Sequence, residues 1–143
     1  FRNGWVFDTT NTIANPASTE RSGTSDYSIE LIFTQPWSSF SIIHPTGFET
    51  KNHTAVSLMV YGGDMGWHDL YLISYDTNGA KLGTQNISTL APGGYIQPNT
   101  WSAIEVPLSL LNAVNIPIGN LEIESAYVTE RLWIDEIKFI PER

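Results

Sequence analysis

The sequence is built from short runs of alternating apolar and polar residues that are separated by turn-forming residues. The runs are rich in Val, Ile, Tyr, Phe and Trp, and Gly, Pro, Asn and Asp bound them. A period of two is that of a β-strand, and many short strands with turns between them are typical of antiparallel sandwiches and barrels. We therefore predict an all-β fold of about nine strands. The predicted strands are 4–8, 27–33, 38–43, 55–61, 68–75, 82–88, 101–108, 121–128 and 132–140.

The segments between these runs carry recognisable turn signals. Asp76-Thr77-Asn78-Gly79 lies between two predicted strands, and Asn-Gly is a strong hairpin signal. The residues 109–112 follow a proline and are expected to form a single helical turn. The residues 9–25 are rich in Thr, Ser and Asn, and we predict that they form a long loop between strands.

Alternation assigns one face of each strand to the core. The opposite face of the strand 68–75 is not polar, because Tyr71, Ile73 and Tyr75 alternate with Leu70 and Leu72. Apolar and aromatic side chains on an outward face indicate either a second covering layer or a binding surface. The predicted core residues are Ile29, Leu31, Phe33, Phe40, Ile42, Val56, Leu58, Val60, Leu70, Leu72, Ile104, Val106 and Leu108.

Length and charge exclude several classes of protein. The 143 residues correspond to one domain, and 15 Asp and Glu against 7 Lys and Arg leave a net charge of −8. Seven scattered cations do not form the basic face that nucleic acids or anionic membranes require. There is no cysteine for thiol chemistry. The chain begins abruptly at Phe1, and we expect residues 1–143 to be a single module excised from a larger protein.

Several segments together resemble a known family. They are Asn3-Gly4-Trp5, the stretch 21–33, Pro36-Trp37-Ser38-Ser39-Phe40-Ser41-Ile42, the run 101–109, and Trp133-Ile134-Asp135-Glu136-Ile137-Lys138-Phe139. In order and spacing, over nearly the whole chain, they resemble the jelly-roll carbohydrate-binding modules that are attached to polysaccharide-degrading enzymes. The resemblance implies a jelly-roll β-sandwich, a structural calcium ion near the terminal strands, and a sugar site on the concave sheet or the loop edge.

Asp135 raises a question about the last strand. With strict alternation it shares a face with Trp133, Ile137 and Phe139, and an inward carboxylate is costly unless it is paired or metal-bound. Three interpretations remain open: hydrogen bonds to backbone or hydroxyl groups, an ion pair with Arg21 or Arg131, and coordination of a hard cation. Calcium takes oxygen ligands. The candidate metal ligands are Asp8, Glu20 and Asp135, with Asp26 as a further partner.

Aromatic residues are the candidates for sugar contact. Flat C–H faces of sugars stack on indole and phenol rings, and carboxylates accept hydrogen bonds from the hydroxyl groups. Five tryptophans are present, of which Trp101 and Trp133 are expected in the core. Core packing is the alternative for every ring. The candidate carbohydrate-binding residues are Trp37, Tyr61, Trp67, His68, Tyr71, Glu124 and Tyr127.

We find no catalytic motif, and we expect the chain not to be an enzyme. The expected function is non-catalytic polysaccharide binding by a secreted or extracellular monomer that is tethered to a catalytic domain. The alternative is a protein–protein or adhesion module of the same fold, in which the aromatic face meets protein.

Overall fold

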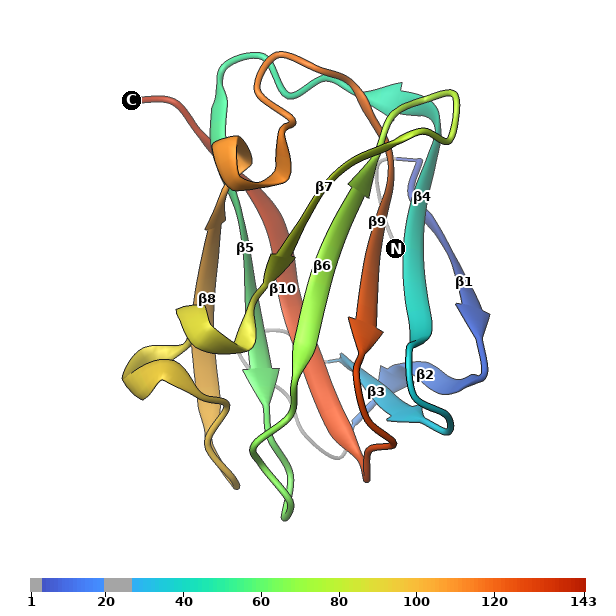
Figure 1. Cartoon of the computed structure of the whole chain (residues 1–143), viewed down its shortest axis with the longest axis vertical. Coiled ribbons are helices and arrows are strands. Elements are labelled where there is room, and N and C mark those ends of the chain that lie inside the picture. Colours follow the sequence, from blue (N-terminus) through green and yellow to red (C-terminus); the bar gives the residue numbers. More distant parts are fainter. Residues whose placement is uncertain (1–3, 20–26) are drawn as a thin grey trace.

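The computed structural model describes residues 4–19 and 27–143. Two antiparallel sheets of five strands each pack face to face as a sandwich (Figure 1). Sheet A has the order β1-β4-β9-β6-β7, and sheet B has the order β2-β3-β10-β5-β8. The prediction of an antiparallel β-sandwich is confirmed.

The strands of sheet A are β1 (Val6–Thr10), β4 (Ser38–Phe48), β9 (Ile118–Ser125), β6 (Leu70–Tyr75) and β7 (Lys81–Asn86). Those of sheet B are β2 (Thr12–Ser18), β3 (Ser28–Phe33), β10 (Leu132–Pro141), β5 (His53–Tyr61) and β8 (Trp101–Pro107). Three short 3₁₀ helices lie in the connections: η1 (Ser88–Leu90), η2 (Pro92–Gly94) and η3 (Leu108–Leu111).

The core lies between the two sheets, where the inward positions of facing strands meet. Burying each large apolar side chain contributes about 1.5–3 kcal/mol relative to leaving it exposed. Twelve of the thirteen predicted core residues are buried, and Ile29 is partly buried against the same cluster. The predicted hairpin and helical turn also form, because Asp76 accepts hydrogen bonds from the Asn78 and Ala80 amides and η3 follows Pro107.

The prediction of a long loop over residues 9–25 is wrong for the part that the structure describes. The end of β1 and all of β2 lie within it. β2 is an edge strand that pairs with β3, and its register shifts between Asn15 and Ser18. An edge strand tolerates Pro16 and polar side chains because one row of its backbone groups needs no partner in the sheet. The polar composition of β2 is therefore the reason that the sequence pattern did not predict this strand.

A β-bulge in β10 answers the question about Asp135. Trp133 and Asp135 lie opposite Tyr61 and Met59 on the outer side of sheet B, and the register then shifts before Lys138. Glu136 has a φ of 53° at this shift, and the Asp135 carboxylate accepts a hydrogen bond from the Glu136 amide at 2.8 Å.

Beyond the bulge the parity is reversed. Ile137 and Phe139 pack against the core, whereas Trp133 and Asp135 face outward. The prediction that Asp135 shares a face with Ile137 and Phe139 is therefore wrong, because the additional residue of the bulge breaks the period of two.

Three connections lie at one end of the sandwich, at the bottom of Figure 1. They are the β3–β4 connection (34–37), the β5–β6 connection (62–69) and the β9–β10 connection (126–131). Trp37, Trp67 and Tyr127 each lie in one of them and are exposed. The fold thus brings three rings that are far apart in the sequence to the same end of the molecule.

Candidate functional site

The outer side of sheet A carries aromatic and polar side chains on neighbouring strands. The strand register aligns them in rows, because Glu124 lies opposite both Ser39 and Tyr71, and Glu122 lies opposite both Ser41 and Ile73. We call these residues, with Trp37 immediately before the start of β4, the sheet A face. Its outward residues are Asp8, Thr10, Trp37, Ser39, Ser41, Tyr71, Ile73, Tyr75, Glu122 and Glu124.

Trp37 and Tyr71 form the aromatic part of this face. Their ring centroids are 5.4 Å apart with an interplanar angle of 48°. The Trp37 amide donates to the Ser125 carbonyl oxygen at 2.7 Å, which places the residue beside the end of β9. The Trp37 side chain is nevertheless 56% exposed. The pair therefore presents aromatic surface to solvent at one end of the sheet A face.

Two glutamates on β9 form the polar part. Glu122 accepts hydrogen bonds from the hydroxyl groups of Tyr75 at 3.3 Å and Ser41 at 3.4 Å. Burial, together with the hydrogen bond and the negative charge of Glu122, raises the pKa of Glu124 to about 7. Burial and the same neighbouring carboxylates raise the pKa of Tyr75 to about 12. Near neutral pH Glu124 is thus partly protonated, and the carboxylate oxygens that carry no proton are hydrogen-bond acceptors.

The middle of the sheet A face is shielded by the larger side chains around it. Ile73 is 2% exposed and Ser41 is 8% exposed, although both point away from the core. A ligand would therefore first meet the rings and carboxylates that surround them. Exposed aromatic rings beside carboxylate acceptors match the chemistry of a neutral sugar, which has apolar C–H faces and donating hydroxyl groups.

Of the seven sequence-predicted sugar-binding residues, the fold brings together Trp37, Tyr71 and Glu124 on this face. Tyr61 lies on the outer side of sheet B, where its ring meets those of Trp101 at 5.5 Å and Trp133 at 5.9 Å. Tyr127 lies in the β9–β10 connection and is 64% exposed. Among the described residues, we find no ring contact between Tyr127 and Trp37 or Tyr71.

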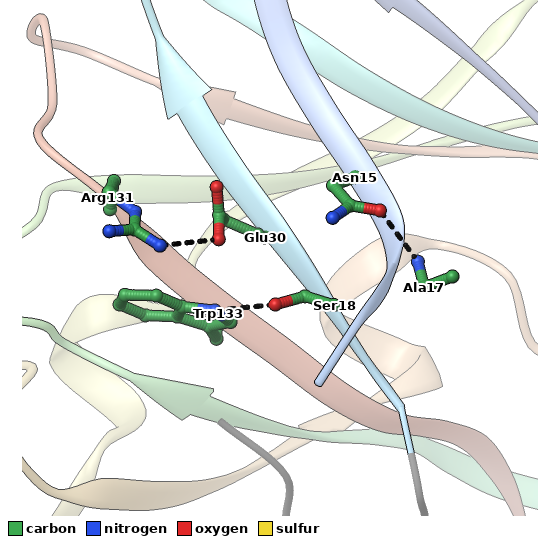
Figure 2. A network of polar contacts seen from close by, with 6 residues as sticks. All are labelled: Asn15, Ala17, Ser18, Glu30, Arg131 and Trp133. Atoms are coloured by element: carbon green, nitrogen blue, oxygen red, sulfur yellow. Dashed lines mark hydrogen bonds and ion pairs between the residues drawn. The ribbon is translucent and has the colours of Figure 1, made fainter. Parts of the chain in front are cut away.

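Trp133 is buried although it faces outward from sheet B. Figure 2 shows its indole N–H directed at the Ser18 hydroxyl, at 3.3 Å, with the Arg131–Glu30 ion pair beside the ring. The Arg131 guanidinium lies 5.0 Å from the ring centroid, a cation–π distance. Because Trp133 is only 5% exposed, this cluster has a structural role. The sequence predicted Trp133 in the core; it is buried, but it lies on the outer side of sheet B and outside the cluster between the two sheets.

His68 and Trp67 are neighbours with opposite environments. His68 is 2% exposed, and its Nε2 lies 2.6 Å from the Gly62 carbonyl oxygen, so it supports the β5–β6 connection and offers no surface to a ligand. Burial lowers the pKa of His68. Trp67 is 67% exposed, and its ring stacks on Tyr95 rather than on the sheet A face.

The predicted metal ligands do not meet. Asp8 faces outward from sheet A opposite Ser41, and Asp135 faces outward from sheet B opposite Met59. The two sheets and the core lie between them, so these carboxylates do not fit one ion. Glu20 and Asp26 lie outside the described residues. Within 4–19 and 27–143 we find no group of three or more His, Asp or Glu side chains arranged to hold a metal.

The sequence pattern did not identify two aromatic residues that contact the candidate site residues. Tyr95, the stacking partner of Trp67, follows two glycines in the β7–β8 connection and carries no strand pattern. Tyr75 shares the parity of Tyr71, and this signal placed it on the outward face but not beside Glu122. Among the described residues, we find no helix with the length and apolar character needed to span a membrane.

No family model and no curated protein sequence matches the chain. Solved structures do resemble it. A family 11 carbohydrate-binding module from Clostridium thermocellum, in complex with a β-1,3-1,4-mixed-linked tetrasaccharide, has a TM-score of 0.63 and 13% identity; the match covers 97% of this chain and 89% of that one. A structure of carbohydrate-binding modules from the β-sandwich superfamily has a TM-score of 0.59 and 12% identity, and covers 96% and 57%.

Another of the similar structures is that of an enzyme. The β-1,2-glucanase from Parabacteroides distasonis has a TM-score of 0.65 and 12% identity over 97% of this chain, which corresponds to 23% of the glucanase chain. The chain thus spans little more than half of the superfamily structure and about a quarter of the glucanase. At these identities the likeness concerns the fold: the chain has the β-sandwich fold of carbohydrate-binding modules.

Proposed function

We propose that the chain is a non-catalytic module that binds a neutral polysaccharide on the sheet A face. The observation that carries the proposal is the alignment of Trp37 and Tyr71 with Glu122 and Glu124 across three neighbouring strands. The fold supports it, because similar structures include a carbohydrate-binding module that was solved in complex with a β-1,3-1,4-mixed-linked tetrasaccharide.

Each part of the face has a distinct role in this proposal. The exposed ring of Trp37 and the partly exposed ring of Tyr71 stack on the C–H faces of sugar units, as aromatic side chains do at other interfaces. Glu122 and Glu124 accept hydrogen bonds from sugar hydroxyl groups and orient the chain. The net charge of −8 disfavours polyanionic polymers and leaves binding of neutral ones unaffected.

We also propose the context in which the module acts. It is a monomeric, extracellular module that is tethered to a catalytic domain and keeps that domain at its polymer, where the tether raises the local concentration of substrate. The glucanase in which a matching region is 23% of the chain supports this arrangement. We also propose a structural calcium ion. Asp135 would be one of its ligands, whereas Asp8, on the opposite outer face, would not.

The test is titration of the purified chain with soluble oligosaccharides of glucose, xylose and mannose, including a β-1,3-1,4-mixed-linked tetrasaccharide. We expect Trp37→Ala and Tyr71→Ala each to weaken binding at least about fivefold, by analogy with a nucleic-acid base stacked on one aromatic ring, which contributes about 1–3 kcal/mol. Glu122→Gln should weaken binding less, because the amide retains one acceptor oxygen.

The matched control is Val114→Ala, because Val114 is 53% exposed in the β8–β9 connection at the other end of the sandwich. It should bind as the unchanged chain does. Unchanged affinity in Trp37→Ala and Tyr71→Ala would remove the site from the sheet A face. Absence of binding to every oligosaccharide and polymer would reject polysaccharide binding and favour the protein-binding alternative.

A further inference from the structure

Trp67 has a backbone conformation that a large side chain rarely adopts. Its φ is 52°, in the left-handed region. Among the described residues, the non-glycine positions with positive φ are asparagines apart from Trp37, Trp67 and Glu136. Asparagine tolerates this region, whereas a bulky residue there is strained. Of the five tryptophans, the two exposed ones are also the two in this conformation.

The β5–β6 connection holds Trp67 firmly in this position. The Trp67 amide donates to the Ile96 carbonyl oxygen at 2.7 Å, and the Asn99 amide donates to the Gly63 carbonyl oxygen at 2.8 Å. Gly66 approaches the next segment so closely that a Cβ atom would meet the Pro98 nitrogen at 2.6 Å. Within the connection, the buried His68 ring lies at hydrogen-bond distance from the Gly62 carbonyl oxygen and so joins its two ends. The connection is thus clamped against residues 95–99.

The Trp67 ring is supported on one side and open on the other. It stacks on Tyr95 with centroids 3.9 Å apart and an interplanar angle of 14°. Trp67 remains 67% exposed. Tyr95 therefore acts as a backing that fixes the orientation of the indole and leaves its other face to solvent. A ring that only filled a gap would be covered on both faces.

We propose that Trp67 and Tyr95 form a second sugar-binding site, separate from the sheet A face. This inference rests on the proposed function, from which it takes the class of ligand, a neutral polysaccharide. Trp37 is anchored to β9 of sheet A and contacts Tyr71, whereas Trp67 is anchored to the segment that leads into β8 of sheet B. The two rings therefore have different supports.

The size of the apolar surface identifies a sugar as the occupant. Beside Trp67 the exposed apolar side chain in this connection is Met65, at 38%, and its neighbours are Asp64 and three glycines. A stable protein interface buries about 800 Å² on each partner. One indole face is far smaller and matches a single sugar ring. Asp64 supplies an acceptor for a hydroxyl group and disfavours an anionic sugar.

The experiment follows the indole N–H signals of the ¹⁵N-labelled chain by NMR during titration with the same oligosaccharides. Trp67→Gly and Trp37→Gly assign the two signals, and both replacements suit a positive φ. Trp67→Phe keeps a ring on Tyr95 and confirms the assignment if Trp67→Gly does not fold. We expect the Trp67 signal to shift with a neutral oligosaccharide, and to shift with the same midpoint in Trp37→Gly.

Each other outcome decides against one of the two proposals. If the Trp37 signal shifts and the Trp67 signal does not, the second site is rejected and the sheet A face stands. If the Trp67 response disappears in Trp37→Gly, both rings belong to one continuous site and the inference is overturned. If the Trp67 signal alone responds, the second site stands and the sheet A face fails. No response of either signal rejects both.

Discussion

Glu122 and Glu124 lie two positions apart on β9 and share a hydrogen bond on the sheet A face. Strand alternation points both carboxylates to the same side, and burial of Glu124, together with the hydrogen bond and the negative charge of Glu122, raises the pKa of Glu124. The consequence is a titration near neutral pH.

This pair should make stability depend on pH. The pKa of Glu124 is about 7 in the folded protein and 4.5 when unperturbed, so the folded state binds more protons than the unfolded state between these values. The contribution is present below pH 4.5 and is lost as the pH rises through about 7. Thermal unfolding followed across this range should show a melting temperature that falls with rising pH.

The control for this prediction is Glu124→Gln, which removes the titrating group and keeps its shape. His68 acts in the opposite direction, because burial lowers its pKa and stability is lost as the pH falls. Comparison of the two proteins isolates Glu124, since His68 is present in both. Identical pH dependence in the variant would show that Glu124 does not titrate as described.

Trp67→Gly should change stability little. A non-glycine residue in the left-handed region costs about 1–2 kcal/mol, and the stacking lost with Tyr95 is worth about 0.5–1.5 kcal/mol. The opposing terms leave the free energy of unfolding within about 1 kcal/mol of the original. Denaturant unfolding measures it. Trp133→Ala is the contrast, because a buried aromatic lost to Ala costs about 3–5 kcal/mol; an equally large loss in Trp67→Gly would give Trp67 a structural role.

Glu136→Gly should stabilise the protein. Glu136 is at the β10 bulge with a φ of 53°, a conformation that costs about 1–2 kcal/mol and that glycine adopts freely. Glycine also gives the unfolded chain more conformational entropy, which offsets part of this relief. We therefore expect the free energy of unfolding, measured with denaturant, to rise by about 0.5–1 kcal/mol. Glu105→Gly is the matched control at an exposed position of the regular strand β8, and it should destabilise by about 1 kcal/mol. A loss in Glu136→Gly would show that the carboxylate has an essential partner.

Removal of metal tests the calcium proposal. If Asp135 binds a structural calcium ion, a chelator should lower the melting temperature of the unchanged chain and of Asp8→Asn, because Asp8 lies on the opposite outer face. The chelator should have no further effect on Asp135→Asn. An unchanged melting curve together with a metal-free elemental analysis would reject the ion, and Asp135 would then serve the bulge through the Glu136 amide.

The local pattern of the sequence determined most of the strands, most of their inward faces and the outward position of the rings of Tyr71 and Tyr75. Alternation is a short-range property: Leu70 and Leu72 are buried wherever β6 lies, so Tyr71 must face the other way. The exposure of Trp67 could likewise be read from the glycines around it. These features follow from the residues of one segment alone.

The tertiary structure decided which segments meet. Trp37 reaches Tyr71, 34 positions later, through pairing of β4 and β6 with β9, and no pattern within either strand encodes this register. The bulge at Glu136 turned Asp135 away from Phe139, and sheet membership placed Asp8 and Asp135 on opposite faces. Strand pairing depends on contacts between distant segments, and one added residue reverses every side chain beyond it.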